Sequence, residues 1–150
     1  MTLARTLTRW FLVLAYLAAG VLHVAMPAPF LGIMPPAVPF PEGIIFWTGV
    51  AELLGAIGLA QSISPALRRA AGIGLALYAL CVWPANIQHM VNDLSGDGGL
   101  GLGYHIPRMI AQPVIIWAAL WASRVIDWPF AGKDQPSRSS RSDRSSSSDP

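Results

Sequence analysis

The chain has 150 residues, of which 53% are hydrophobic and only 12% are charged. Soluble domains carry about 25% charged residues, so this composition excludes an ordinary water-soluble domain. The formal net charge is +2, and a single cysteine excludes an intramolecular disulfide or a cysteine-based zinc site. The composition favours an integral membrane protein.

Four apolar segments are long enough to cross the hydrocarbon core of a bilayer, which takes about 20 helical residues. In chain order they are predicted at about residues 10–26, 43–63, 70–90 and 108–126. Apolar residues surround each segment on all sides, as expected of helices in lipid or deep in a core. The sequence therefore predicts an all-α fold, a bundle of four transmembrane helices, as one membrane domain over residues 1–127.

The segments between these helices differ in composition. Residues 28–42 are rich in proline and are predicted to form an irregular, extended loop. Residues 91–106 are rich in glycine and are predicted to form a flexible polar loop. Residues 128–150 are rich in serine, arginine and aspartate, so a disordered cytoplasmic tail is expected there.

The basic residues predict the orientation in the membrane. An even number of spans puts both termini on one side. That side would hold most of the basic residues outside the tail, which are Arg5, Arg9, Arg68, Arg69 and Arg124, whereas the other would hold Arg108. Loops rich in lysine and arginine stay in the cytoplasm. We therefore expect a multi-pass protein of the bacterial inner (plasma) membrane with both termini in the cytoplasm.

Five polar residues in the predicted spans are candidates for a binding pocket or polar cluster. Polar groups inside a bilayer are costly and usually face the bundle interior. Glu52 is the deepest, about nine residues or roughly 13 Å into its helix. The others are expected in the same outer half of the bundle, and the full set is His23, Glu52, Asn86, Arg108 and Gln112. Either Arg108 or a protonated His23 could pair with Glu52. Two interpretations stay open: a polar clasp that fixes helix register, or a pocket that binds a ligand or handles protons.

Small residues recur on the same helices and are expected to pack them closely. The helix-packing glycines are Gly20, Gly49, Gly55 and Gly58. A metal site is not expected, because His23, His89, His105 and Glu52 show no HxxxH or HxxE spacing that would place two ligands on one helix face. No nucleic-acid partner is expected.

The motifs at these positions resemble those of the DoxX family of small four-helix bacterial membrane proteins. The matching stretches are GVLHVAMPAPF from Gly20, IMPPAVPFP from Ile33, TGVAELLGAIGL from Thr48 and PANI from Pro84. The resemblance covers about residues 8–124. The positions that match the family motifs are His23, Pro35, Pro36, Gly49, Glu52, Gly55, Pro84, Asn86 and Gln112.

This resemblance implies a role beside membrane redox systems, because the DoxX family is named for components linked to a thiosulfate:quinone oxidoreductase. No intrinsic cofactor is evident in the sequence, so a quinone or a partner redox subunit in or on the membrane would carry the electrons. The leading hypothesis is a redox-associated, quinone-interacting membrane subunit with a polar pocket in its outer half. The alternatives are a non-catalytic structural or assembly protein and, less favoured, a carrier of small solutes or lipids.

Overall fold

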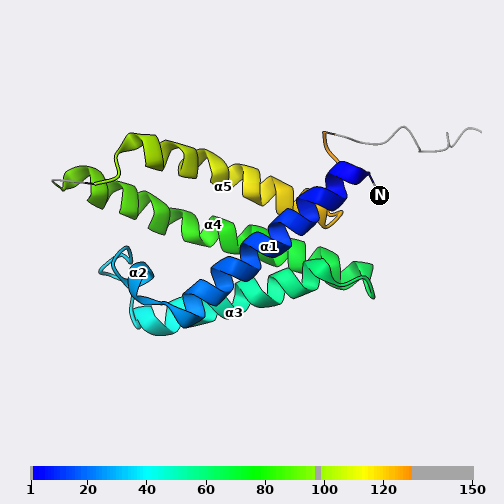
Figure 1. Cartoon of the computed structure of the whole chain (residues 1–150), viewed down its shortest axis with the longest axis horizontal. Helices are drawn as coiled ribbons and strands as arrows, with labels where there is room; N and C mark the ends of the chain where they lie inside the picture. Colours follow the sequence, from blue (N-terminus) through cyan, green and yellow to red (C-terminus); the bar gives the residue numbers. More distant parts are fainter. Residues whose placement is uncertain (1, 97–98, 130–150) are drawn as a thin grey trace, which may run out of the picture.

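The computed structural model describes residues 2–96 and 99–129, and within them the chain is helical with no strand. The helices are α1 (Leu3–Ala25), α2 (Ala28–Leu31), α3 (Pro41–Ala60), α4 (Pro65–Ser95) and α5 (Leu102–Ala122). The four long helices run back and forth along the long axis of the molecule, and the short α2 lies beside the junction of α1 and α3 (Figure 1).

Proline and serine mark most of the helix ends. Pro41 and Pro65 each stand in the first turn of a helix, where a missing backbone N–H removes no intrahelical hydrogen bond. The Ser64 side chain accepts a hydrogen bond from the backbone N–H of Leu67 and caps α4. Pro27 comes directly after the end of α1. The turn between α3 and α4 is therefore tight, and the two helices are antiparallel neighbours.

The structure corrects the predicted loops. Residues 28–31 form the short helix α2, with Pro27 as its N-cap residue and Pro29 in its first turn, a position that proline tolerates. Helix α4 continues to Ser95, and α5 begins at Leu102. Most of the region predicted as a flexible loop at 91–106 is therefore helical, and only a short connection remains.

Small residues let the long helices approach closely. A Cβ added at Gly20 would lie 2.9 Å from the Gly49 carbonyl oxygen, and one added at Gly49 would lie 3.0 Å from the Gly20 carbonyl oxygen. Gly55 and Gly58 do the same for α3 against α4, where the neighbours are the side chains of Leu75 and Ala71. The packing role expected of these glycines therefore has a defined geometry: one pair of helices meets at Gly20 and Gly49, and the next at Gly55 and Gly58.

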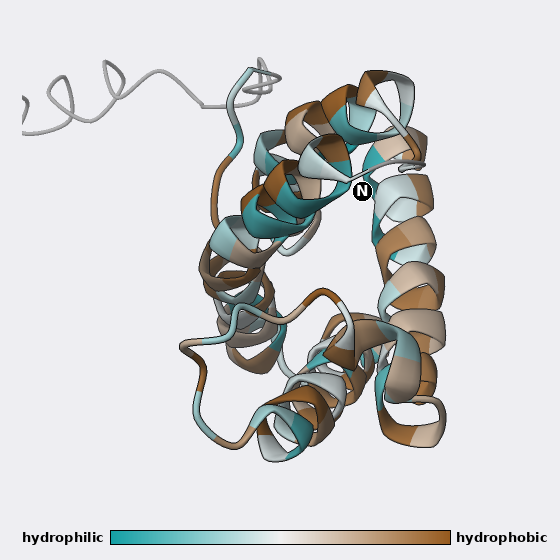
Figure 2. Ribbon diagram, turned by 90° about the vertical axis from the view of Figure 1, so that its left-hand side faces the viewer, coloured by the Kyte–Doolittle hydropathy of each residue, from teal (hydrophilic) through white to brown (hydrophobic). Residues whose placement is uncertain are grey.

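Three helices, α1, α3 and α4, are long and apolar enough to cross a membrane. Hydrophobic residues are distributed along all four long helices (Figure 2), and many large ones are exposed, for example Phe11 at 69% and Leu54 at 63%. Helix α5 has the length but carries His105, Arg108 and Gln112 in its first half, and it is not among these three. Three candidate membrane-spanning helices are therefore shown, one fewer than expected.

The two ends of the described chain lie at the same end of the bundle. The Arg5 guanidinium donates to the Asp127 carboxylate at 2.8 Å, which ties the start of α1 to the segment after α5. The connection between α4 and α5 lies at the opposite end, on the same side as α2 (Figure 1). The disorder predicted for the tail concerns residues that, from 130 to 150, lie outside the described part.

Candidate functional site

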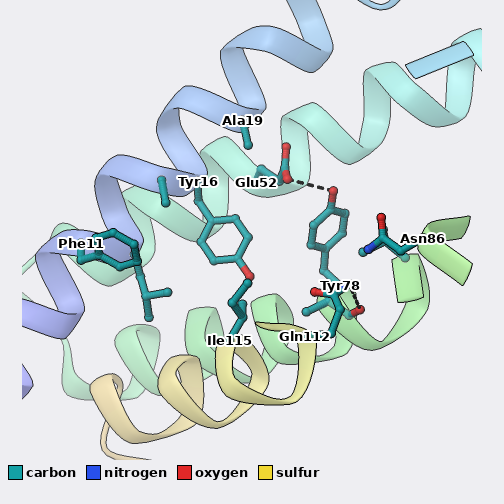
Figure 3. Close-up of a pocket in the computed structure, with 12 residues that line it drawn as sticks. Phe11, Tyr16, Ala19, Glu52, Tyr78, Asn86, Gln112 and Ile115 are labelled. Atoms are coloured by element: carbon teal, nitrogen blue, oxygen red, sulfur yellow. Dashed lines mark hydrogen bonds between the residues drawn. The ribbon is translucent and has the colours of Figure 1, made fainter. Parts of the chain in front are cut away.

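Glu52 is the centre of a buried polar cluster that joins three helices. Its side chain comes from α3 and the residue is only 3% exposed. One carboxylate oxygen, Oε2, lies 2.7 Å from Nδ1 of His23 on α1, and the other, Oε1, accepts the Tyr78 hydroxyl of α4 at 2.8 Å (Figure 3). Both carboxylate oxygens are thus satisfied by donors from neighbouring helices. We call His23, Glu52 and Tyr78 the Glu52 cluster.

His23 is held by contacts at its Nδ1 atom and on a face of its ring. Its Nδ1 lies 3.0 Å from the Ala19 carbonyl as well as 2.7 Å from Glu52. With Glu52 ionised both neighbours are acceptors, and Nδ1 then carries the hydrogen. The ring also stacks on Phe30 of α2, with centroids 3.9 Å apart and planes 28° apart. The short helix α2 therefore covers the cluster from the end of the bundle.

The approach of α1 to α3 makes this pairing reachable. The Gly20 and Gly49 backbones face each other one helical turn before His23 and Glu52. A side chain at Gly49 would also meet the Cβ of His23 at 2.8 Å. The spacing GxxH on α1 and GxxE on α3 therefore places each polar residue beside the close contact of its own helix.

Two tyrosines complete the cluster, and the sequence reasoning missed both. Tyr78 bonds directly to Glu52, and the ring of Tyr16 meets the ring of Tyr78 edge to face, with centroids 6.3 Å apart. A tyrosine hydroxyl in an apolar segment usually finds a hydrogen-bond partner. That rule, applied to the predicted span at 70–90, would have found Tyr78.

A cavity of about 290 Å³ lies next to Glu52 among α1, α3, α4 and α5. Its walls are mostly apolar and aromatic. The polar side chains that reach it are those of Glu52, Tyr78, Asn86 and Gln112, together with the hydroxyl of Tyr16 (Figure 3). Gln112 is only 6% exposed and donates from Nε2 to the Ala79 carbonyl at 3.3 Å. The cavity therefore has a polar side formed by α3, α4 and α5 and an apolar remainder.

The five candidate residues do not form one network. Arg108 does not pair with Glu52; it donates to Asn86 Oδ1 at 2.7 Å and to His89 Nδ1 at 2.8 Å. Both oxygens of Glu52 already have donors, and Arg108 stands near the start of α5, toward the end of the bundle. The partner of Glu52 is thus His23, and Asn86 lies between the cavity and Arg108.

A second polar cluster, which the sequence reasoning did not anticipate, lies where α4 meets α5. Nε2 of His105 lies 2.8 Å from Oδ2 of Asp93, which also accepts the backbone N–H groups of Leu100 at 2.6 Å and Gly101 at 3.3 Å. His89 is close by, with its ring centroid 5.1 Å from that of His105. The spacing HxxxD, from His89 to Asp93, is the signal that the search for HxxxH and HxxE passed over. We call His89, Asp93 and His105 the α4–α5 cluster.

Comparison with known proteins corrects the family assignment. A family model described as a domain of unknown function, DUF8561, matches residues 12–124. No curated protein and no solved structure matches the chain. The expected membership in the DoxX family is wrong, because the matching model is a different one. Small residues and polar side chains at helix contacts are common to membrane helices in general, so short motifs of this kind do not identify a family. The chain belongs to the DUF8561 family.

Proposed function

We propose that this chain is a membrane protein that binds the polar head of a largely apolar molecule of the quinone class in the cavity beside Glu52. The proposal rests on the cavity itself, an apolar space of about 290 Å³ with polar side chains on one side. Small-molecule sites are mostly apolar with a few placed polar groups, and they begin near 300 Å³. A space of this size suits a ring with its substituents and leaves an isoprenoid tail outside.

The polar side of the cavity offers donors to a quinone carbonyl. Asn86 and Gln112 each carry an amide NH₂ with two hydrogens, and the amide of Gln112 uses one of them on the Ala79 carbonyl. Aromatic rings of Phe11 and Tyr16 line the apolar side and offer flat contact surfaces. Glu52, held by His23 and Tyr78, presents its carboxyl group to the polar side of the cavity.

The cavity also borders the surface that would face lipid. Phe11 belongs to its lining and is 69% exposed, on the side where α1 and α5 pack over only a short stretch. A membrane-dissolved molecule would enter between these two helices. This entrance is part of the proposal, as is the fourth membrane span formed by α5.

The proposed orientation puts both termini in the cytoplasm of a bacterial inner-membrane protein. Arg5, Arg9 and Arg68 belong to the end of the bundle that holds the start of α1 and the turn between α3 and α4. Basic residues gather on the cytoplasmic side of membrane proteins. The Glu52 cluster would then lie nearer the outer side.

The test compares two alanines of α1. Ala15 lines the cavity, whereas Ala18 is exposed on the same helix and does not. The full-length protein in detergent micelles should bind a short-chain quinone saturably by calorimetry, and Ala15→Phe should abolish binding while Ala18→Phe retains it. No saturable binding by the wild-type protein, or equal binding by both variants, contradicts the proposal.

A second candidate is a structural or assembly protein in which the same residues only fix the helix packing. The observation that favours it is that Glu52 already has two partners and connects α1, α3 and α4. In that case Ala15→Phe should leave every measured property except stability unchanged. Glu52→Gln should then lower thermal stability and change no ligand binding.

A further inference from the structure

The α4–α5 cluster brings together three side chains of the types that bind metal ions. His89 and Asp93 are one turn apart on α4, and His105 is in the first turns of α5. Each residue offers one ligand atom, and these atoms all lie within 4.8 Å of one another. We propose that His89, Asp93 and His105 bind a divalent first-row transition metal ion of the zinc type. This site shares no side chain with the Glu52 cluster.

The donor set indicates which ions fit. Two imidazole nitrogens and one carboxylate oxygen are ligands of Zn²⁺, Fe²⁺ and related ions, whereas Mg²⁺ and Ca²⁺ prefer oxygen alone. Ligand atoms around zinc stand about 2.0 to 2.2 Å from the ion, so three atoms within 4.8 Å need only side-chain adjustment to reach it. Three protein ligands leave a fourth position for water or a small ligand.

The buried histidine has one nitrogen that faces Asp93 and one that does not. His105 is 0% exposed, and its Nδ1 is buried without a hydrogen-bond partner among residues 2–96 and 99–129. A buried polar atom without a partner costs free energy, so native proteins rarely keep one without a reason. Its other nitrogen lies 2.8 Å from Asp93 Oδ2. The ion would therefore bind at Nε2, the nitrogen that faces Asp93, and the unpartnered Nδ1 is not a ligand atom.

The carboxylate is positioned by backbone as well as by histidine. The N–H groups of Leu100 and Gly101 both donate to Oδ2 of Asp93, which holds the side chain against the start of α5. Contacts of this kind orient metal ligands in proteins and strengthen ion binding. On binding, the ion would replace the hydrogen between Asp93 and His105.

The positive charge of Arg108 disfavours binding of a cation at this site, so a variant that removes this charge tests the proposal. Its guanidinium donates to His89 Nδ1 at 2.8 Å and to Asn86 Oδ1 at 2.7 Å. It thereby occupies a lone pair of one proposed ligand and places a positive charge beside the site. The ion must compete with Arg108 for His89, while Asn86 gives the displaced guanidinium a partner.

The experiment titrates the full-length protein in detergent micelles, after chelator treatment, with Zn²⁺ by calorimetry and with Co²⁺ by visible absorption. We expect one equivalent to bind, with cobalt ligand-field bands that Zn²⁺ removes and millimolar Mg²⁺ does not. Asp93→Asn and His89→Gln should each weaken binding at least about tenfold. Arg108→Gln should strengthen it.

The controls change the same residue types elsewhere. Asp127→Asn removes a carboxylate that pairs with Arg5 at the other end of the bundle, and His23→Gln removes a histidine of the Glu52 cluster. Both should keep wild-type affinity. The proposal is overturned if the wild-type protein binds no equivalent of either ion, if His23→Gln loses binding as His89→Gln does, or if Arg108→Gln weakens it. Loss of quinone binding with zinc binding retained would contradict the proposed function only.

Discussion

The two polar clusters satisfy a carboxylate in different ways. In the Glu52 cluster each carboxylate oxygen takes one side-chain donor, and the donors come from two other long helices. In the α4–α5 cluster the carboxylate of Asp93 takes two backbone N–H groups and one histidine, and the nearby Arg108 donates to His89 and not to this carboxylate. Deep in an apolar bundle the backbone is used up by helix hydrogen bonds, so only side chains can serve. At a helix junction the backbone is available.

This difference predicts different consequences of mutation. Losing Glu52 leaves Tyr78 on α4 without its acceptor and His23 on α1 with the Ala19 carbonyl alone, whereas losing Asp93 affects one junction at the end of the bundle. The variants below compare the two clusters in unfolding free energy, measured in mixed micelles titrated with SDS.

The largest effect is expected for Glu52→Ala. It removes two interhelical hydrogen bonds, each worth up to about 1.7 kcal/mol in a membrane protein, so we expect a loss of about 2 to 3 kcal/mol. Glu42→Ala is the matched control, because Glu42 lies in the first turn of the same helix and is exposed. The control should lose less than about 1 kcal/mol. Similar losses for the two variants would mean that the Glu52 cluster does not hold the helices together.

Gly49→Ala should follow, with a loss of about 2 kcal/mol, the cost of overpacking a close contact. The added methyl would stand 2.8 Å from the His23 Cβ and 3.0 Å from the Gly20 carbonyl oxygen, so α1 must move away from α3. Gly43→Ala is the control on the same helix, since nothing lies within 4 Å of a Cβ added there. It should be neutral or stabilising, because alanine favours a helix over glycine by about 1 kcal/mol. If Gly49→Ala leaves the unfolding free energy as unchanged as Gly43→Ala does, the packing described between α1 and α3 is contradicted.

The sequence was sufficient to predict the helices but not the pairing of side chains. Apolar length and proline positions located the long helices, and the small-residue spacing located the contacts of Gly20, Gly49, Gly55 and Gly58. Depth along each helix, however, gives no rotation about the axis. Arg108 and His23 were therefore both left as partners for Glu52, and the structure pairs Glu52 with His23 and Tyr78 and turns Arg108 to Asn86 and His89.

The residues that sequence reasoning missed share a reason. Tyr78 and Asp93 are ordinary in their local sequence and become important only because another helix presents a partner. The connection between α4 and α5 was also expected to be long and flexible, so nothing in the sequence indicated that His89 and His105 lie together. The two helices continue past the predicted ends, and that continuation brings the two rings to 5.1 Å.

Tyr78→Phe should have a smaller effect than the two variants above, a loss of about 0.6 kcal/mol, the mean for one interhelical hydrogen bond in a membrane protein. The ring and its edge contact with Tyr16 remain, and only the hydroxyl bond to Glu52 is lost. Combining Tyr78→Phe with Glu52→Ala tests the pairing. In the Glu52→Ala protein, Tyr78→Phe should cause no further loss of stability, because the carboxylate that its hydroxyl bonds is already gone. Fully additive losses would show that the hydroxyl does not stabilise the fold through Glu52.

Asp93→Asn, measured without metal, should have the smallest effect, a loss of about 0.5 kcal/mol. The asparagine side-chain oxygen can still accept the backbone N–H groups of Leu100 and Gly101, so only the charged contact with His105 weakens. Asp127→Asn, at an exposed ion pair with Arg5, is the control and should change stability by a similar, small amount.

Added Zn²⁺ should make the stabilities of these two variants differ. The wild-type protein and Asp127→Asn should gain stability from the bound ion, and Asp93→Asn should gain much less, because ligand binding stabilises only a folded state that holds the site. Equal gains in all three proteins would place the zinc elsewhere and leave the α4–α5 cluster with a purely structural role.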